Sequence, residues 1–90
     1  MPRYMVERIF PDGLDIPAND DGAATCLAVV ERNADVGVTW VHSYVSEDRR
    51  KTYCIYDSHD VTALQRAAER NRLPVEAITR VQILSPYLYL

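Results

Sequence analysis

The sequence lacks an excess of basic residues, because ten Lys and Arg face thirteen Asp and Glu in 90 residues, giving a formal net charge of −3. Nucleic acid is bound by clustered Lys and Arg, so the charge balance argues against a nucleic-acid partner. The apolar runs are far shorter than the roughly 20 residues of a membrane-spanning helix, and nothing resembles a secretory leader. We therefore expect a soluble, cytoplasmic protein with no membrane partner.

Cysteine is also scarce, with Cys26 and Cys54 the only two in the chain. The sequence has no closed zinc site of the C-x2-C and H-x3-H type, so we expect no tight structural metal. The acidic segment "DGLDIPANDDG" lacks the D-x-[DN]-x-[DN]-G frame of a calcium loop. We interpret that segment as a solvated loop.

The composition is that of one small globular domain, with 48% hydrophobic and 26% charged residues. A chain of this length cannot divide a core, so we predict a single domain over residues 1–90. Its small size also makes oligomerisation a natural source of stability.

Changes of hydrophobic period divide the chain into six elements. Strands are predicted where β-branched and aromatic residues gather, and helices where apolar residues recur three or four apart. The predicted strands are residues 3–10, 38–46, 50–57 and 77–84, and the helices are residues 23–37 and 60–73. Asp20 or Asp21 can cap the first helix, and Asp60 the second. The tail "SPYLYL" is left as a short apolar segment that adds an arm to an assembly.

This order of elements predicts an α+β, ferredoxin-like βαββαβ fold. Two strand–helix–strand halves joined by a hairpin form a four-stranded antiparallel sheet with two helices on one face. The other face stays uncovered. Along residues 38–46 two sets of side chains alternate: Trp40, His42 and Tyr44 in one, Val41, Ser43 and Val45 in the other.

We expect the more apolar valine set to face the helices and the aromatic set to lie on the open face. An uncovered aromatic face is an exposed patch in a monomer, and a second subunit is the simplest cover. The sequence therefore predicts a homodimer that packs sheet against sheet, an assembly of the dimeric α/β-barrel type.

Three segments carry a resemblance to a known family. They are "MPRYMVERIFPDGL", "GVTWVHSYVSEDRRKTYCIYDSHD" and "AAERNRLPVEAITRVQIL". Together they resemble a family of small actinobacterial proteins, formerly a domain of unknown function and now described as nickel-binding. The most specific part is W-V-x-S-Y-V followed by C-I-Y after a charged turn. The resemblance implies a dimeric ferredoxin-like protein with a capacity to bind nickel, and no established reaction.

The candidate nickel ligands are His42, Cys54, Glu7 and His59. Nickel favours imidazole nitrogen and accepts thiolate and carboxylate. Glu7, Cys54 and His42 belong to three neighbouring strands of the predicted sheet, and His59 with Asp57 offers a weaker, exposed site. Each also has a plainer interpretation: Cys54 as a small buried side chain, His42 as a hydrogen-bonded interface residue and His59 as a solvated loop residue.

Two registers of the hairpin around "EDRR" remain open. If Ser46 pairs with Lys51, His42 lies opposite Ile55 while Cys54 lies opposite Ser43 on the helix side. A three- or five-residue loop, or a bulge, instead places His42 beside Cys54 on the open face. The first register makes Cys54 a core thiol, and the second makes it a ligand.

Three classes of function follow from these observations. We favour a nickel-binding protein that buffers or sequesters the metal. The alternative is a small-molecule binder or cofactor-independent enzyme with its cavity between two open faces, where His42 is a general base. No nucleophile, base and orienting group are recognisable, which disfavours the enzyme. The third is a dimerisation module without chemistry.

Overall fold

Within residues 1–89, which the computed structural model describes, the elements follow the predicted order. They are β1 (Arg3–Ile9), α1 (Asp20–Ala34), β2 (Thr39–Val45), β3 (Lys51–Asp57), α2 (Val61–Asn71) and β4 (Ala77–Val81), followed by the short 3-10 helix η1 (Pro86–Tyr89). Strand β4 ends three residues before the predicted strand does. Leu90, the last residue of the predicted arm, lies outside the described residues.

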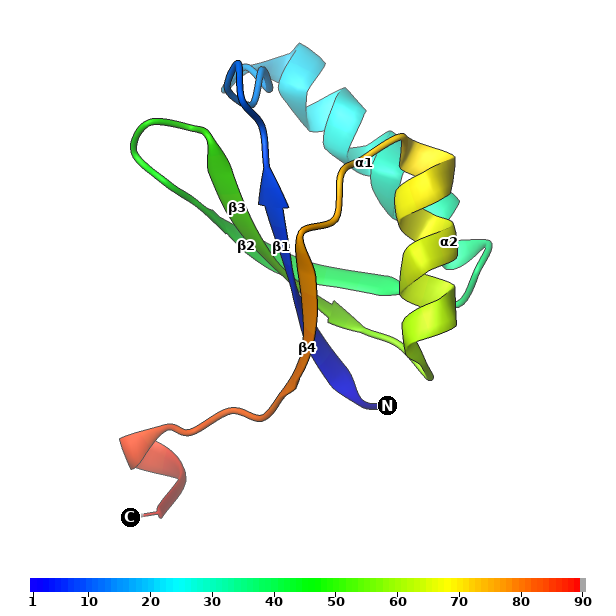
Figure 1. Ribbon diagram of the computed structural model, residues 1–90, viewed down its shortest axis with the longest axis vertical. Coiled ribbons are helices and arrows are strands. Elements are labelled where there is room, and N and C mark those ends of the chain that lie inside the picture. The colour runs from blue at the N-terminus through cyan, green and yellow to red at the C-terminus, as the bar shows by residue number, and fades with distance from the viewer. Residues whose placement is uncertain (90) are drawn as a thin grey trace.

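The four strands form one antiparallel sheet in the order β2-β3-β1-β4. Both helices lie on the same side of this sheet, and the chain after β4 leads away from it (Figure 1). This arrangement confirms the predicted ferredoxin-like architecture, in which two strand–helix–strand halves interlock through the central strands β1 and β3. In residues 1–89, no helix is long and apolar enough to cross a membrane.

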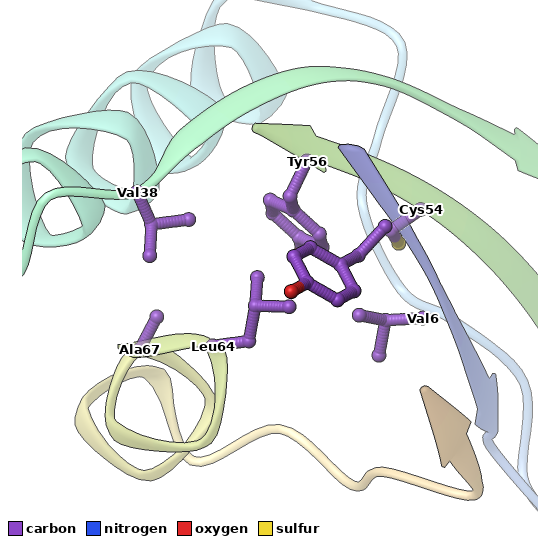
Figure 2. Packing of buried hydrophobic residues seen from close by; sticks show 7 residues of the cluster. Val6, Val38, Cys54, Tyr56, Leu64 and Ala67 are labelled. Atoms are coloured by element: carbon purple, nitrogen blue, oxygen red, sulfur yellow. The ribbon is translucent and has the colours of Figure 1, made fainter. Parts of the chain in front are cut away.

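The core lies between the sheet and α2. Figure 2 shows Leu64 and Ala67 of α2 turned toward Val6 of β1 and Tyr56 of β3. Of the four apolar residues at helical spacing in α2, Leu64, Ala67 and Ala68 are buried as predicted, whereas Val61 in the first turn is exposed. Asp60 caps α2 as expected, because its carboxylate accepts a hydrogen bond from the backbone N–H of Ala63 at 2.8 Å.

The N-cap of helix α1 lies one residue before the first of the two predicted caps. The cap is Asn19, whose side chain accepts from the backbone N–H of Gly22 at 3.1 Å, so the prediction of Asp20 or Asp21 is wrong. Both aspartates lie in the first turn, where their charge suits the helix dipole. Only Gly22 and Asn33, near the two ends of α1, are buried. The helix therefore stands away from the sheet along its middle.

A β-bulge in β2 changes the face on which Trp40 lies. Trp40 is opposite Tyr56 and His42 is opposite Ile55, which leaves Val41 as an extra residue. Because of this insertion, Trp40 turns to the helix side, packs against the core and donates from Nε1 to Ser43 Oγ at 2.8 Å. The predicted position of Trp40 on the open face is wrong, whereas His42 and Tyr44 lie there as expected.

The β2–β3 hairpin adopts the first of the two registers left open by the sequence. The backbone N–H of Ser46 donates to the Lys51 carbonyl at 2.9 Å, and Cys54 lies opposite Ser43. The turn includes Arg49 in the left-handed region, with φ of 60°. The Arg49 side chain donates to the carbonyls of Leu14 and Ile16, at 2.9 and 3.0 Å. The hairpin therefore holds the connection between β1 and α1.

Candidate functional site

The face of the sheet opposite the helices is the first candidate surface, and we call it the open face. Its residues follow from strand register and alternation. They include Arg3, Met5 and Glu7 of β1, His42 and Tyr44 of β2, Tyr53, Ile55 and Asp57 of β3, and Ala77, Thr79 and Val81 of β4. No helix covers this face within the part of the chain that the structure describes (Figure 1).

His42 lies on edge strand β2 and is exposed. Its ring meets the Tyr44 ring edge-on, with the centroids 5.1 Å apart and the planes at 84°. Aromatic pairs favour this edge-to-face geometry, so Tyr44 restricts the orientation of the imidazole. An exposed and oriented imidazole is a suitable ligand for a transition metal.

Glu7 lies on the same face as His42, but in another row of the sheet. Glu7 is opposite Tyr53, which is opposite Tyr44, whereas His42 is in the row of Ile55 and Met5. Strands lie about 4.8 Å apart, so β1 and β2 are separated by roughly 10 Å. Glu7 and His42 are therefore neither directly opposite nor on adjacent strands within one chain.

Cys54 lies on the opposite face of the sheet from His42. It is 7% exposed, belongs to the core cluster and donates from Sγ to Thr52 Oγ1 at 3.6 Å. The register that the β2–β3 hairpin adopts therefore makes Cys54 a core thiol. His42 and Cys54 do not form the cluster that the other register would have produced.

His59 is exposed in the connection between β3 and α2. Its proposed companion Asp57 is engaged elsewhere, because both carboxylate oxygens accept from Arg3, at 2.8 and 3.2 Å. These hydrogen bonds, with burial opposing them, hold the pKa of Asp57 below its ordinary value. Among residues 1–89, no three His, Cys, Asp or Glu side chains are grouped as a metal site.

The second candidate surface is a cavity of about 560 Å³ on the helix side of the sheet, which we call the helix-side cavity. It opens because α1 stands away from the sheet. Its walls come from the sheet, from α1, and from the connection between them. The segment "DGLDIPANDDG" was interpreted as a solvated loop, and the cavity was therefore not predicted, although Leu14, Ile16 and Pro17 line its wall. The apolar residues within that acidic segment were the available signal.

Arg8 is the most buried charged group of the helix-side cavity, at 4% exposure. It donates from Nη1 to the Pro74 carbonyl at 2.7 Å and from Nη2 to the Tyr56 hydroxyl at 3.1 Å. Its buried Nε–H has no hydrogen-bond partner among residues 1–89. Burial raises the pKa of Tyr56, with the Arg8 charge acting in the opposite direction, so the phenol is neutral at pH 7.

The fold and sequence are similar to known proteins. The crystal structure of SCO4226 from Streptomyces coelicolor A3(2) superposes with a TM-score of 0.73 at 18% identity, over 92% of this chain and 99% of that chain. The curated proteins contain no match to the sequence. The family described as "Nickel responsive protein SCO4226-like" matches residues 4–81. This match spans most of the sheet and both helices, and the chain therefore belongs to the SCO4226-like family of nickel-responsive proteins.

Proposed function

We propose that this protein binds nickel on the open face, with His42 as the imidazole ligand and Glu7 as a carboxylate ligand. A second copy of the chain, packed on the same face, completes the ligand set. The observation that carries the proposal is the exposed His42 on an uncovered sheet face, in a chain that belongs to a nickel-responsive family.

The need for a second copy follows from the spacing of the ligands. Within one chain, His42 and Glu7 are two strands apart and in different rows, and among residues 1–89 no three ligand-type side chains are grouped. When two identical faces pack together, groups that are separated in each copy can meet across the interface, and each contact occurs twice. His42 of one copy with His42 or Glu7 of the other supplies the nitrogen and oxygen ligands that nickel accepts.

We further propose that the protein buffers or sequesters nickel in the cytoplasm. Both cysteines carry free thiols, which suits a reducing compartment. The occupancy of a site between two copies depends on the concentrations of both the protein and the metal, so metal is released when either concentration falls. That property suits storage and release.

The test is calorimetric titration of tag-free protein with nickel, and then with zinc. Saturable binding is expected, and His42→Ala should weaken nickel affinity by about 10-fold or more, since a ligand is lost. Glu7→Gln removes the carboxylate charge at nearly constant size and should also weaken binding. Affinity should fall at acid pH, because imidazole must be deprotonated to bind metal.

Two controls separate the sites. His59→Ala and Cys54→Ser remove the other candidate ligands, from the exposed connection and from the core. Both variants should keep the affinity and stoichiometry of the wild type. Unchanged nickel binding in His42→Ala would reject the open-face site, and lost binding in His59→Ala would move the site to the β3–α2 connection.

A further inference from the structure

The helix-side cavity has mainly apolar walls, and its polar lining consists of arginines and neutral side chains. The arginines that line it are Arg8, Arg32 and Arg49, and its lining within the described residues includes no Asp or Glu. The chain as a whole has a formal net charge of −3. The cavity thus concentrates positive charge in an acidic protein, and this favours an anionic ligand.

Arg8 is a buried cation in the cavity wall that lacks a negatively charged partner among the described residues. Its guanidinium, a cation, is almost fully buried. Its two hydrogen bonds go to a carbonyl and to a neutral phenol, and neither acceptor carries a charge. A buried cation without a counter-ion is costly, and so is an unpaired buried N–H. A carboxylate in the cavity beside the guanidinium would supply the missing counter-ion.

The other residues that line the cavity indicate the size and polarity of the rest of the ligand. Phe10, Leu14 and Ile16 approach from the β1–α1 connection, while Val29 and Trp40 line other parts of the cavity. The volume of about 560 Å³ is within the range of small-molecule sites. An apolar lining with one buried cation fits a molecule that has a hydrocarbon or aromatic body and one acidic end.

We propose that the helix-side cavity binds a small organic carboxylic acid with an apolar body, whose carboxylate pairs with Arg8. Arg32 and Arg49 lie in the same lining, but their Nε–H groups are already bonded, to Asn71 and to Leu14. Arg8 is therefore the anchor. This site is on the opposite side of the sheet from His42, and it does not depend on the nickel proposal.

The first experiment compares decanoate with 1-decanol, which has the same chain length and no charge. Trp40 is the single tryptophan and lines the cavity, so its fluorescence reports occupancy, and calorimetry gives the affinity. Decanoate should bind about 10- to 100-fold more tightly than decanol, the range that a hydrogen-bonded charged partner supplies. Equal affinities, or no saturable binding of decanoate, would overturn the proposal.

Variants locate the site. Arg8→Met removes the charge at similar length and should abolish the preference for decanoate over decanol. Arg66→Met, at an exposed position of α2 outside the cavity lining, should preserve that preference. If Arg8→Met binds decanoate as the wild type does, Arg8 is not the anchor.

A second pair of variants keeps the test decisive if Arg8→Met fails to fold. Val29 lines the cavity, whereas the next residue of α1, Val30, is 41% exposed and does not. Val29→Phe should fill the space and weaken decanoate binding by about 10-fold or more, as expected when a ring occupies the ligand's volume. Val30→Phe should have no effect. Equal decanoate affinities in these two variants would place the ligand elsewhere.

Discussion

At the scale of single residues, the clearest electrostatic contact is the ion pair between Arg3 of β1 and Asp57 of β3. The two residues are opposite each other in the sheet, with Nε and Oδ1 2.8 Å apart. The pKa of Asp57 is lowered in the folded protein, so this carboxylate contributes stability above its ordinary pKa of about 3.9. The contribution is lost as the pH falls through the lowered folded value.

We predict that Asp57→Asn is less stable than the wild type at pH 7 and that this difference disappears at acid pH. The effect should be small, because both side chains are partly exposed and solvent screens the pair. Urea unfolding of both proteins at pH 7 and near pH 2 measures it. A difference that persists unchanged at the acid pH would assign the loss to packing rather than to charge.

Single residues also show where sequence reasoning ends. The alternation of Trp40, His42 and Tyr44 placed two of them correctly, but the bulge at Val41 turned Trp40 to the other face. The position of a bulge cannot be predicted from the residue types alone, because it depends on how side chains pack on both faces of the sheet. The position of Cys54 was undecided for a related reason, since a one-residue change of register reverses every side chain.

At the scale of elements, α1 depends on a close approach between its first turn and the preceding connection. A Cβ atom added to Gly22 would overlap the carbonyl oxygen of Pro17. Gly22 is also the residue whose N–H bonds the Asn19 cap. The first turn of α1 is thus held by a contact that only glycine permits.

We predict that Gly22→Ala destabilises the protein by about 1–3 kcal/mol, the usual cost of forcing extra volume into a packed site. Helix propensity alone predicts the opposite sign, a gain of about 0.8–1 kcal/mol. Thermal or urea unfolding decides between them. Ala24→Gly, at an exposed position in the same turn, is the control for propensity and should cost about 1 kcal/mol. A stabilised Gly22→Ala would show that the connection yields to the added methyl group.

The elements themselves were predictable, whereas the way α1 packs was not. The apolar positions of α2 predicted its buried face, because Leu64 and Ala67 pack directly on the sheet. In α1 the same spacing includes Leu27, which is 59% exposed, while Val29 lines the cavity. Periodicity identifies a helix without fixing its distance from the sheet, so the helix-side cavity could not be derived from the sequence.

At the scale of the whole molecule, the uncovered sheet face is the feature that the isolated chain does not explain. Tyr44 is 63% exposed there beside His42, and Tyr53, Ile55 and Met5 of the neighbouring strands are only partly covered. A sheet with one layer of helices leaves its other face to solvent or to a partner. Because identical faces pair most simply with two-fold symmetry, we expect a homodimer built on this face.

We predict that the wild type sediments as a dimer at micromolar concentration and that Tyr44→Asp sediments as a monomer, because a charge would be buried at the interface. Leu27→Asp, at an exposed apolar position on α1, is the matched control and should remain dimeric. A dimer that is lost in Leu27→Asp and kept in Tyr44→Asp would assign the interface to α1. A monomeric wild type would contradict the shared face altogether.

The same pair of variants connects assembly to nickel. If each ion needs ligands from two copies, nickel affinity should follow the dimer fraction. It should fall in Tyr44→Asp, which also loses the ring contact with His42, and be kept in Leu27→Asp. Nickel should also raise the dimer fraction of dilute wild-type protein, since a ligand that binds one assembly state favours that state. Wild-type affinity in a monomeric Tyr44→Asp would mean that one chain holds the metal alone, and would contradict a site shared by two copies.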